Sequence, residues 1–245
     1  MALTDEVVKR NQIDQVHRGE MRKRPYGKRK LRKIIHRAQV LEEEYATFSR
    51  KAAMDYDRVI SKQRVLIYAL RNQLLDGGTV KFPAFFCIAQ ENIRRFVREE
   101  KTLNRQILNR YILDHISFHV SVEEDPVDYT HKREVEEYLF RRVRKSLEEQ
   151  ERRIGNWRGM ESFMRLAALS VIDEAWVEEV DYLQQLQAAV SGRSVAQRNV
   201  LNEFQMDAYE SFKKMETQIK RNLMRSILLS SVYMAEDSKL HIVFR

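Results

Sequence analysis

The sequence predicts an all-α protein with one very long helix, a helical hairpin, a small helical subdomain and at most one or two short strands. Glycine and proline together account for only 10 of the 245 residues, far below the usual level of about 12%. Long stretches contain neither residue, and their apolar positions recur at steps of three and four. With 43% hydrophobic and 33% charged residues, the chain has enough apolar side chains to form a core.

The first long helix is predicted from Lys28 to Leu75, a stretch without glycine or proline that ends at Asp76-Gly77-Gly78. At about 1.5 Å per residue it would extend roughly 72 Å. A compact globule of this chain length has a diameter near 46 Å, by the usual scaling of the radius of gyration. We therefore expect a spine on which other parts are mounted.

The later elements follow from the same patterns. One or two helices are predicted from Ala84 to about Asp114, and a charged helix over 131–154. Alternation from Ile116 to Val122, and again over 239–245, is typical of short strands. Gly155 and Gly159 predict a break in the helical pattern. Helices over 160–190 and 200–230 share a short connection and should form an antiparallel hairpin.

The net charge of +8 is concentrated near the N-terminus. Between Arg18 and Arg37 the chain has ten lysines and arginines and one acid, which gives this segment +9 and the remainder about −1. Such a run suits phosphates of lipid or nucleic acid, or an acidic protein surface. It is equally typical of a solvated helix start.

Few residues suggest catalysis or metal binding. The apolar run before Asp173-Glu174-Ala175 resembles a Walker B box, but the chain has no GxxxxGK[ST] loop, so we expect no ATPase site here. His115 and His119 lack the spacing of a metal site, and none is expected. The single cysteine, Cys87, excludes a disulfide framework and is predicted to lie in the core. Without a signal peptide or an apolar span, a soluble cytosolic protein is expected.

Two blocks of the sequence resemble the SecA preprotein translocase motor. The first looks like the start of its helical scaffold and contains Ala38-Gln39, Arg50-Lys51, Tyr56-Asp57, Gln63-Arg64, Ile67-Tyr68, Arg71 and Leu74-Leu75. The second is similar to its two-helix finger and contains Asp173, Trp176, Glu178, Leu186, Arg193, Ala196-Gln197, Glu203-Phe204 and Phe212. Both blocks occur in the family's order and spacing.

The resemblance implies that this chain is the C-terminal part of such an ATPase, without its motor core. It divides the chain into the end of a nucleotide-binding domain or linker (1–27), a scaffold helix (28–76), a helical wing (77–158), the finger with a second scaffold helix (159–232), and a tail (233–245). ATP and Mg²⁺ would be bound by the full-length family's motor, and no cofactor is expected on this chain. The implied location is the cytoplasmic face of the bacterial membrane, as a peripheral protein.

The resemblance also implies partners: a SecY-type channel, the preprotein, the motor domains and anionic phospholipid. The family motif residues are Tyr56, Asp57, Gln63, Arg64, Tyr68 and Trp176. The finger tip that would touch preprotein or channel is Arg193, Ser194, Val195, Ala196 and Gln197. Contacts to the anionic surface are expected from Arg22, Lys23, Arg24, Lys28, Arg29 and Lys30. Val195 replaces the family's bulky tip aromatic, and such departures resemble an accessory SecA more than the housekeeping motor.

Two alternatives remain open on sequence grounds. Residues 18–37 could bind nucleic acid, although Tyr26 is the only aromatic side chain in the run that could stack on bases. The spine could instead make the chain a stand-alone helical adaptor, with a coiled coil formed either with a second copy, as a homodimer, or with another protein. A mass in solution that rises with concentration would favour the adaptor.

Overall fold

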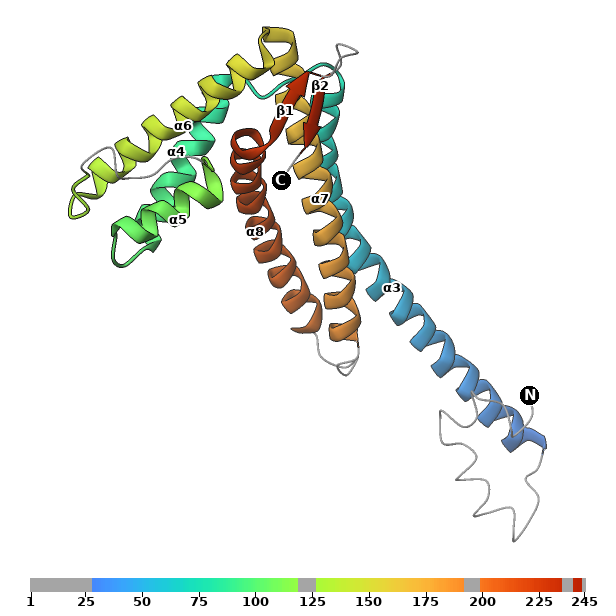
Figure 1. Cartoon of the computed structure of the whole chain (residues 1–245). Coiled ribbons are helices and arrows are strands. Elements are labelled where there is room, and N and C mark those ends of the chain that lie inside the picture. The colour runs from blue at the N-terminus through green and yellow to red at the C-terminus, as the bar shows by residue number, and fades with distance from the viewer. Residues whose placement is uncertain (1–27, 119–126, 192–198, 235–239, 244–245) are drawn as a thin grey trace. The chain divides into compact units, whose positions relative to one another are not determined.

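The computed structural model describes residues 28–118, 127–191, 199–234 and 240–243 (Figure 1). These residues form six helices and two short strands, which confirms the predicted all-α class. The chain divides into two compact units, Met1–Val59 and Ile60–Arg245. Among the described helices, none has the length and low charge of a membrane span.

Helix α3 spans Lys28–Leu75, as the absence of breakers predicts. It ends because Gly77 adopts a φ of 94°, a left-handed conformation that glycine accepts without strain. The amide of Gly78 then donates to the carbonyl of Gln73, which satisfies one of the last free carbonyls of the helix. In the first unit, several apolar side chains of α3 are exposed, including Leu41 and Phe48 at about half of their surface.

Three helices of the second unit form a compact layer: α4 (Phe82–Glu99), α5 (Arg105–His115) and α6 (Lys132–Ile154). Asn104 caps α5 by accepting a hydrogen bond from the amide of Ile107 at 2.9 Å. Their inward faces share one apolar core with the start of α7 and the end of α8, built around Phe85, Ile93, Leu108, Ile112, Tyr138, Leu139, Met160, Phe163, Met224 and Ile227. We call α4–α6 the wing layer.

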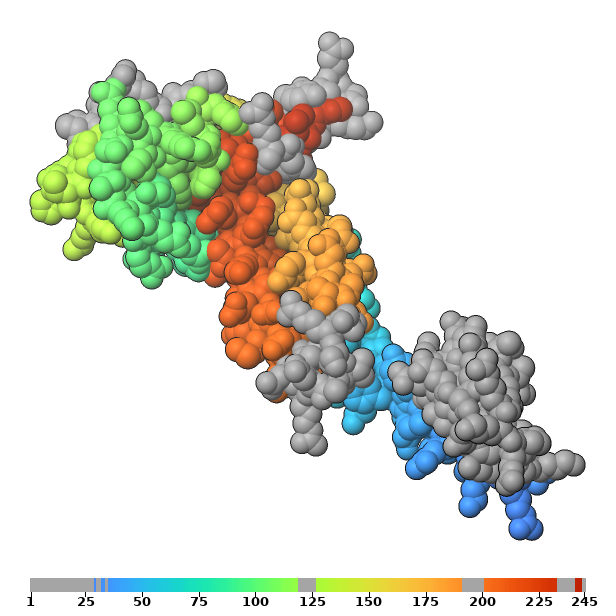
Figure 2. Space-filling view, turned by 90° about the horizontal axis from the view of Figure 1, so that it is seen from below, coloured from blue at the N-terminus to red at the C-terminus, as the bar shows by residue number. Residues whose placement is uncertain are grey.

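Helices α7 (Trp157–Ser191) and α8 (Asn199–Leu229) form the predicted antiparallel hairpin (Figure 1). Figure 2 shows α8 between α7 on one side and the wing layer on the other. Beyond α8, strand β1 (Ser231–Met234) pairs antiparallel with β2 (Leu240–Val243), so that Val232 lies opposite Ile242. Strand β2 lies within the segment where alternation predicts a strand, whereas β1 is not predicted.

Two local predictions are wrong. Ile116 to Phe118 are not a strand, because Ile116 ends α5 by donating to the Ile112 carbonyl and its side chain is fully buried; residues 119–126 lie outside the described residues. The predicted break over Gly155 to Gly159 is limited to Gly155, whose φ of 76° ends α6. Asn156 then caps α7 by accepting a hydrogen bond from the amide of Gly159 at 2.7 Å. Gly159 therefore lies inside α7.

Candidate functional site

The candidate site is the junction where the last four turns of α3, residues 60–75, meet the hairpin. An apolar cluster holds it together, with Ile67 from α3, Trp176 from α7 and Phe212 from α8 all at most 8% exposed. The rings of Tyr68 and Trp176 meet edge to face, with centroids 6.4 Å apart. Because the same cluster includes side chains from three helices, α3 and both arms of the hairpin are packed as one body here.

A bidentate ion pair also joins α3 to α7 at this junction. The Arg71 guanidinium donates from Nε to Asp173 Oδ1 at 2.7 Å and from Nη2 to Oδ2 at 3.2 Å. Both side chains are partly exposed, at 34% and 47%, so solvent screens the attraction. The hydrogen bond to Asp173, helped by its charge, raises the pKa of Arg71. A paired fork of this kind fixes the rotation of α3 relative to α7.

We expect Arg71→Ala and Asp173→Ala to destabilise the second unit by less together than the sum of the two single changes. Such non-additivity is the signature of a direct pair. Because the groups are partly exposed, the coupling should shrink as NaCl rises from about 0.05 M to about 1 M. Denaturant unfolding of the four proteins measures it. Fully additive effects at low salt would contradict the pairing.

A second set of polar groups is buried at the junction. Gln63 Nε2 donates to the carbonyl of Ala208 on α8 at 2.9 Å. Ser211 Oγ donates to Glu179 Oε2 at 2.6 Å, and Glu179 is only 4% exposed. Within the described part of the chain, Oε1 of Gln63 and Oε1 of Glu179 are buried without a hydrogen-bond partner. The buried carboxylate of Glu179 therefore has one oxygen, Oε1, without a hydrogen-bond partner among the described residues.

Burial raises the pKa of Glu179, and the hydrogen bonds from Ser211 and Gln63 offset part of this shift. The folded protein thus binds the proton of Glu179 more tightly than the unfolded chain does. Stability from this group is full below the unfolded pKa near 4.5 and is lost as pH rises through the raised folded pKa. Above the raised folded pKa, the ionised carboxylate costs the fold free energy.

We expect Glu179→Gln to raise the free energy of unfolding relative to the wild type more at about pH 8 than at about pH 4.5, because the variant keeps an acceptor for Ser211 and removes the buried charge. Urea unfolding at the two pH values measures the difference. Glu178→Gln, at the neighbouring exposed position, is the control and should show a small difference that does not change with pH. A pH-independent effect of Glu179→Gln would show that the carboxylate is solvated.

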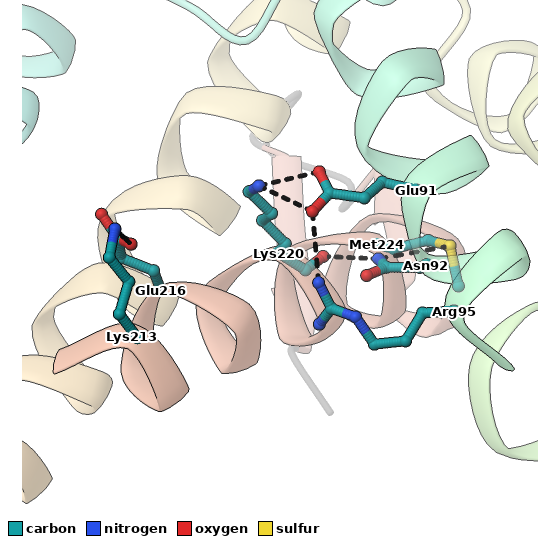
Figure 3. A network of polar contacts seen from close by, with 7 residues as sticks. All are labelled: Glu91, Asn92, Arg95, Lys213, Glu216, Lys220 and Met224. Carbon is teal, nitrogen blue, oxygen red and sulfur yellow. Dashed lines mark hydrogen bonds and ion pairs between the residues drawn. The ribbon is translucent and has the colours of Figure 1, made fainter. Parts of the chain in front are cut away.

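Helix α8 is also fastened to the wing layer, as Figure 3 shows. Glu91 of α4 accepts two hydrogen bonds from Lys220 Nζ, at 2.9 and 2.7 Å, and one from Arg95 Nη2 at 3.2 Å. Next to them, buried Asn92 donates through Nδ2 to the main-chain carbonyl of Lys220 at 2.9 Å. The hairpin is thus connected to α3 on one side and to the wing layer on the other.

The structure brings three of the predicted motif residues together: Gln63, Tyr68 and Trp176 all lie at the junction. Arg64 is exposed beside it. In the first unit, Tyr56 is buried and Asp57 is exposed.

Most residues predicted to contact partners are not described. The finger tip, Arg193 to Gln197, lies outside the described residues, and so do Arg22, Lys23 and Arg24. Lys28, Arg29 and Lys30 lie in α3; of these three, only the Arg29 side chain is described, and it is exposed.

The weaker chemical candidates Asp173 and Cys87 lie on helices α7 and α4. The segment that resembles a Walker B box lies within α7, where Asp173 pairs with Arg71. Cys87 is exposed, so the prediction of a core cysteine is wrong: α4 buries Phe85 and Ala89, and Cys87 lies on the other face of the helix. Among the described residues no three His, Cys, Asp or Glu side chains gather as a metal site.

Glu179 was not singled out from the sequence. Its position in the helical pattern could have indicated that it is buried. On α7 the buried residues Ile172, Ala175, Trp176 and Leu183 follow a helical stripe, and position 179 lies three residues after one and four before another. A carboxylate on such a stripe is rarely left exposed.

Comparison with known proteins identifies the family of the chain. A family model described as the SecA wing and scaffold domain matches residues 26–231. Protein translocase subunit SecA 2 from Staphylococcus aureus strain Newman, and the same subunit from strain N315, are each 31% identical over 204 residues, or 83% of this chain. The matched part is 26% of each relative, so the chain spans about a quarter of their length. The family model covers the spine, the wing layer and the hairpin, and the chain therefore belongs to the SecA wing and scaffold domain family.

Proposed function

We propose that this chain is the scaffold, wing and finger portion of a SecA-like protein translocase. In this role it couples ATP-driven motion of motor domains to the transport of a preprotein through a SecY-type channel. ATP and Mg²⁺ bind in the motor domains and not on this chain. The protein acts at the cytoplasmic face of the bacterial membrane, as a peripheral component.

One observation carries the proposal: the end of α3 is fixed to the hairpin by both apolar packing and a bidentate ion pair. A rotation or shift of this part of α3 is therefore passed to α7 and α8 rather than absorbed at a loose contact. The Glu91–Lys220 pair and the Asn92 hydrogen bond extend the connection to the wing layer. This is the arrangement that a mechanical coupling element needs.

The remaining partners follow from surface character. The half-exposed apolar side chains of α3, such as Leu41 and Phe48, suit burial against the motor domains. The basic run between Arg18 and Arg37 suits anionic phospholipid. The hairpin tip, around Val195, is the part that would meet preprotein and channel.

Site-specific photocrosslinking tests the central claim. The complete translocase that contains this chain would carry benzoylphenylalanine at Val195, or at exposed Glu148 on α6 as the control. With a preprotein stalled in the channel, we expect capture from position 195 and none from 148. Capture from 148 but from no position within 192–198 would refute the finger-tip assignment.

Vesicle binding tests the basic run. We expect the chain to bind phosphatidylglycerol vesicles and not phosphatidylcholine vesicles, with an affinity that falls steeply as salt is raised. Replacing Arg22, Lys23, Arg24, Lys28, Arg29 and Lys30 by glutamine should abolish the binding. Tighter binding to a DNA or RNA duplex than to the anionic vesicles, at the same salt, would favour a nucleic-acid partner instead.

A further inference from the structure

A separate pocket opens in the wing layer, where α4 and α5 meet α8. Its volume is about 350 Å³, at the lower end of the range for ligand sites. One wall is aromatic: the rings of Phe96 and Tyr111 are stacked with centroids 3.9 Å apart. Arg95, His115 and Arg221 contribute polar groups to the lining. None of these residues belongs to the junction with α3.

Two buried nitrogen atoms in this lining have no hydrogen-bond partner within the described part of the chain: Nη1 of Arg95 and Nδ1 of His115. A buried donor left without an acceptor costs about 1–3 kcal/mol, and Nη1 of Arg95 is such a donor, so the lining is suited to a group that can accept hydrogen bonds. Burial lowers the pKa of His115 and favours the neutral imidazole, which supplies a donor at Nδ1 in one of its two tautomers.

The charge around Arg95 is also incompletely balanced (Figure 3). Its nearest carboxylate, Glu91, is held by two shorter hydrogen bonds from Lys220, so one anion serves two cations. Arg221 has no carboxylate within ion-pair distance among the described residues, and its charge acts on both Tyr111 and His115. The lining around Arg95 and Arg221 therefore favours a negatively charged group.

The size of that charge is limited by the acidic residues of the same lining. Three further acids, Glu99, Glu100 and Asp114, line the pocket, and Asp114 lies 3.7 Å from Arg110. Arginines and acids are thus equal in number around the whole lining, which disfavours a doubly charged phosphate. A single carboxylate fits better, since its two oxygens can accept from Arg95 and Arg221, and its methylene stem can pack on the aromatic wall.

We propose that this wing pocket binds one acidic side chain of a peptide segment, with the carboxylate between Arg95 and Arg221 and flanking apolar residues against Phe96 and Tyr111. The pocket then acts as a docking point for a protein partner, distinct from the hairpin tip. The inference does not depend on the proposed role in translocation.

Fluorescence anisotropy tests this with the 245-residue protein and two labelled peptides. One carries a central Phe-Glu-Phe in a glycine-serine background, and the other carries Phe-Gln-Phe. At about 0.1 M salt, where an exposed ion pair is only partly screened, we expect the glutamate peptide to bind at least about tenfold more tightly. Arg221→Ala, at an exposed position, should weaken binding about tenfold. Arg98→Ala, at an exposed position of α4 outside the pocket, should leave it unchanged.

Arg95→Lys is the second variant, because it keeps the charge but removes Nη1. We expect this variant to bind the glutamate peptide more weakly and to bind the glutamine peptide with unchanged, weak affinity. Equal affinities for the two peptides, or an unchanged affinity in Arg221→Ala, would overturn the proposal. Displacement of the glutamate peptide by inorganic phosphate more readily than by acetate would also overturn it, since the pocket would then prefer a dianion.

Discussion

Trp176→Ala is expected to lower the free energy of unfolding by about 3–5 kcal/mol, the usual cost of removing a large buried aromatic side chain. Trp176 is 8% exposed and packs against Ile67 of α3 and Phe212 of α8. Its removal leaves a cavity at the point where three helices meet, and neither α3 nor the hairpin can close it without losing other contacts. Urea unfolding followed by circular dichroism measures the loss.

Trp157→Ala provides a matched control, because the chain has only two tryptophans. Trp157 is 55% exposed at the start of α7, and its ring contacts Phe82 at a centroid distance of 5.4 Å. We expect a loss of about 1 kcal/mol from this contact. Each variant keeps the other tryptophan as a fluorescent reporter of its own region. Equal losses in the two variants would show that the junction is not a tightly packed core.

The second large effect is expected for Gln150→Glu, with a loss of about 2–4 kcal/mol at neutral pH. Gln150 of α6 is 2% exposed, and its Nε2 donates to the carbonyls of Leu228 and Ser230, at 3.2 and 2.8 Å. These carbonyls belong to the end of α8 and the residue before β1. Glutamate has the same shape but would bring a buried negative charge against two acceptor oxygens.

The pH dependence separates this explanation from a packing defect. A protonated glutamate can donate one hydrogen bond, so the loss should be smaller at about pH 4 than at about pH 8. Gln185→Glu makes the same chemical change at an exposed position of α7 and should cost less than about 0.5 kcal/mol. A loss in Gln150→Glu that is unchanged between the two pH values would contradict the proposed role of the amide.

The sequence patterns that predicted the fold correctly are those decided by local physics. Helix α3 has its predicted bounds because nothing within Lys28–Leu75 interrupts a helix and Gly77 ends it. The hairpin was likewise predictable from periodicity and one short connection. Strand β1 was not, because Ser231–Met234 pairs with β2, and such a pairing leaves little trace in a four-residue segment.

Three residues of the junction, Gln63, Tyr68 and Trp176, belong to the two matched blocks, whereas the residues that they contact could not be predicted. Arg71 and Asp173 each occur in a different block, and their ion pair joins positions 102 residues apart. Periodicity gives the face on which a residue lies but not its neighbour on another helix. For the same reason the burial of Glu179 and the exposure of Cys87 become clear only once the packing of α7 and α4 is known.

Helix α8 takes part in two separate cores, through Phe212 and Met215 at the junction and through Met224 and Ile227 in the wing layer. Successive side chains of an α-helix are rotated by about 100° around the helix axis. Inserting or deleting one residue between these two sets would therefore rotate one core out of register with the other. Only changes close to a whole number of turns keep both. Variation in this family therefore has to preserve the number of residues between the two sets of core side chains in α8, more than the identity of its exposed side chains.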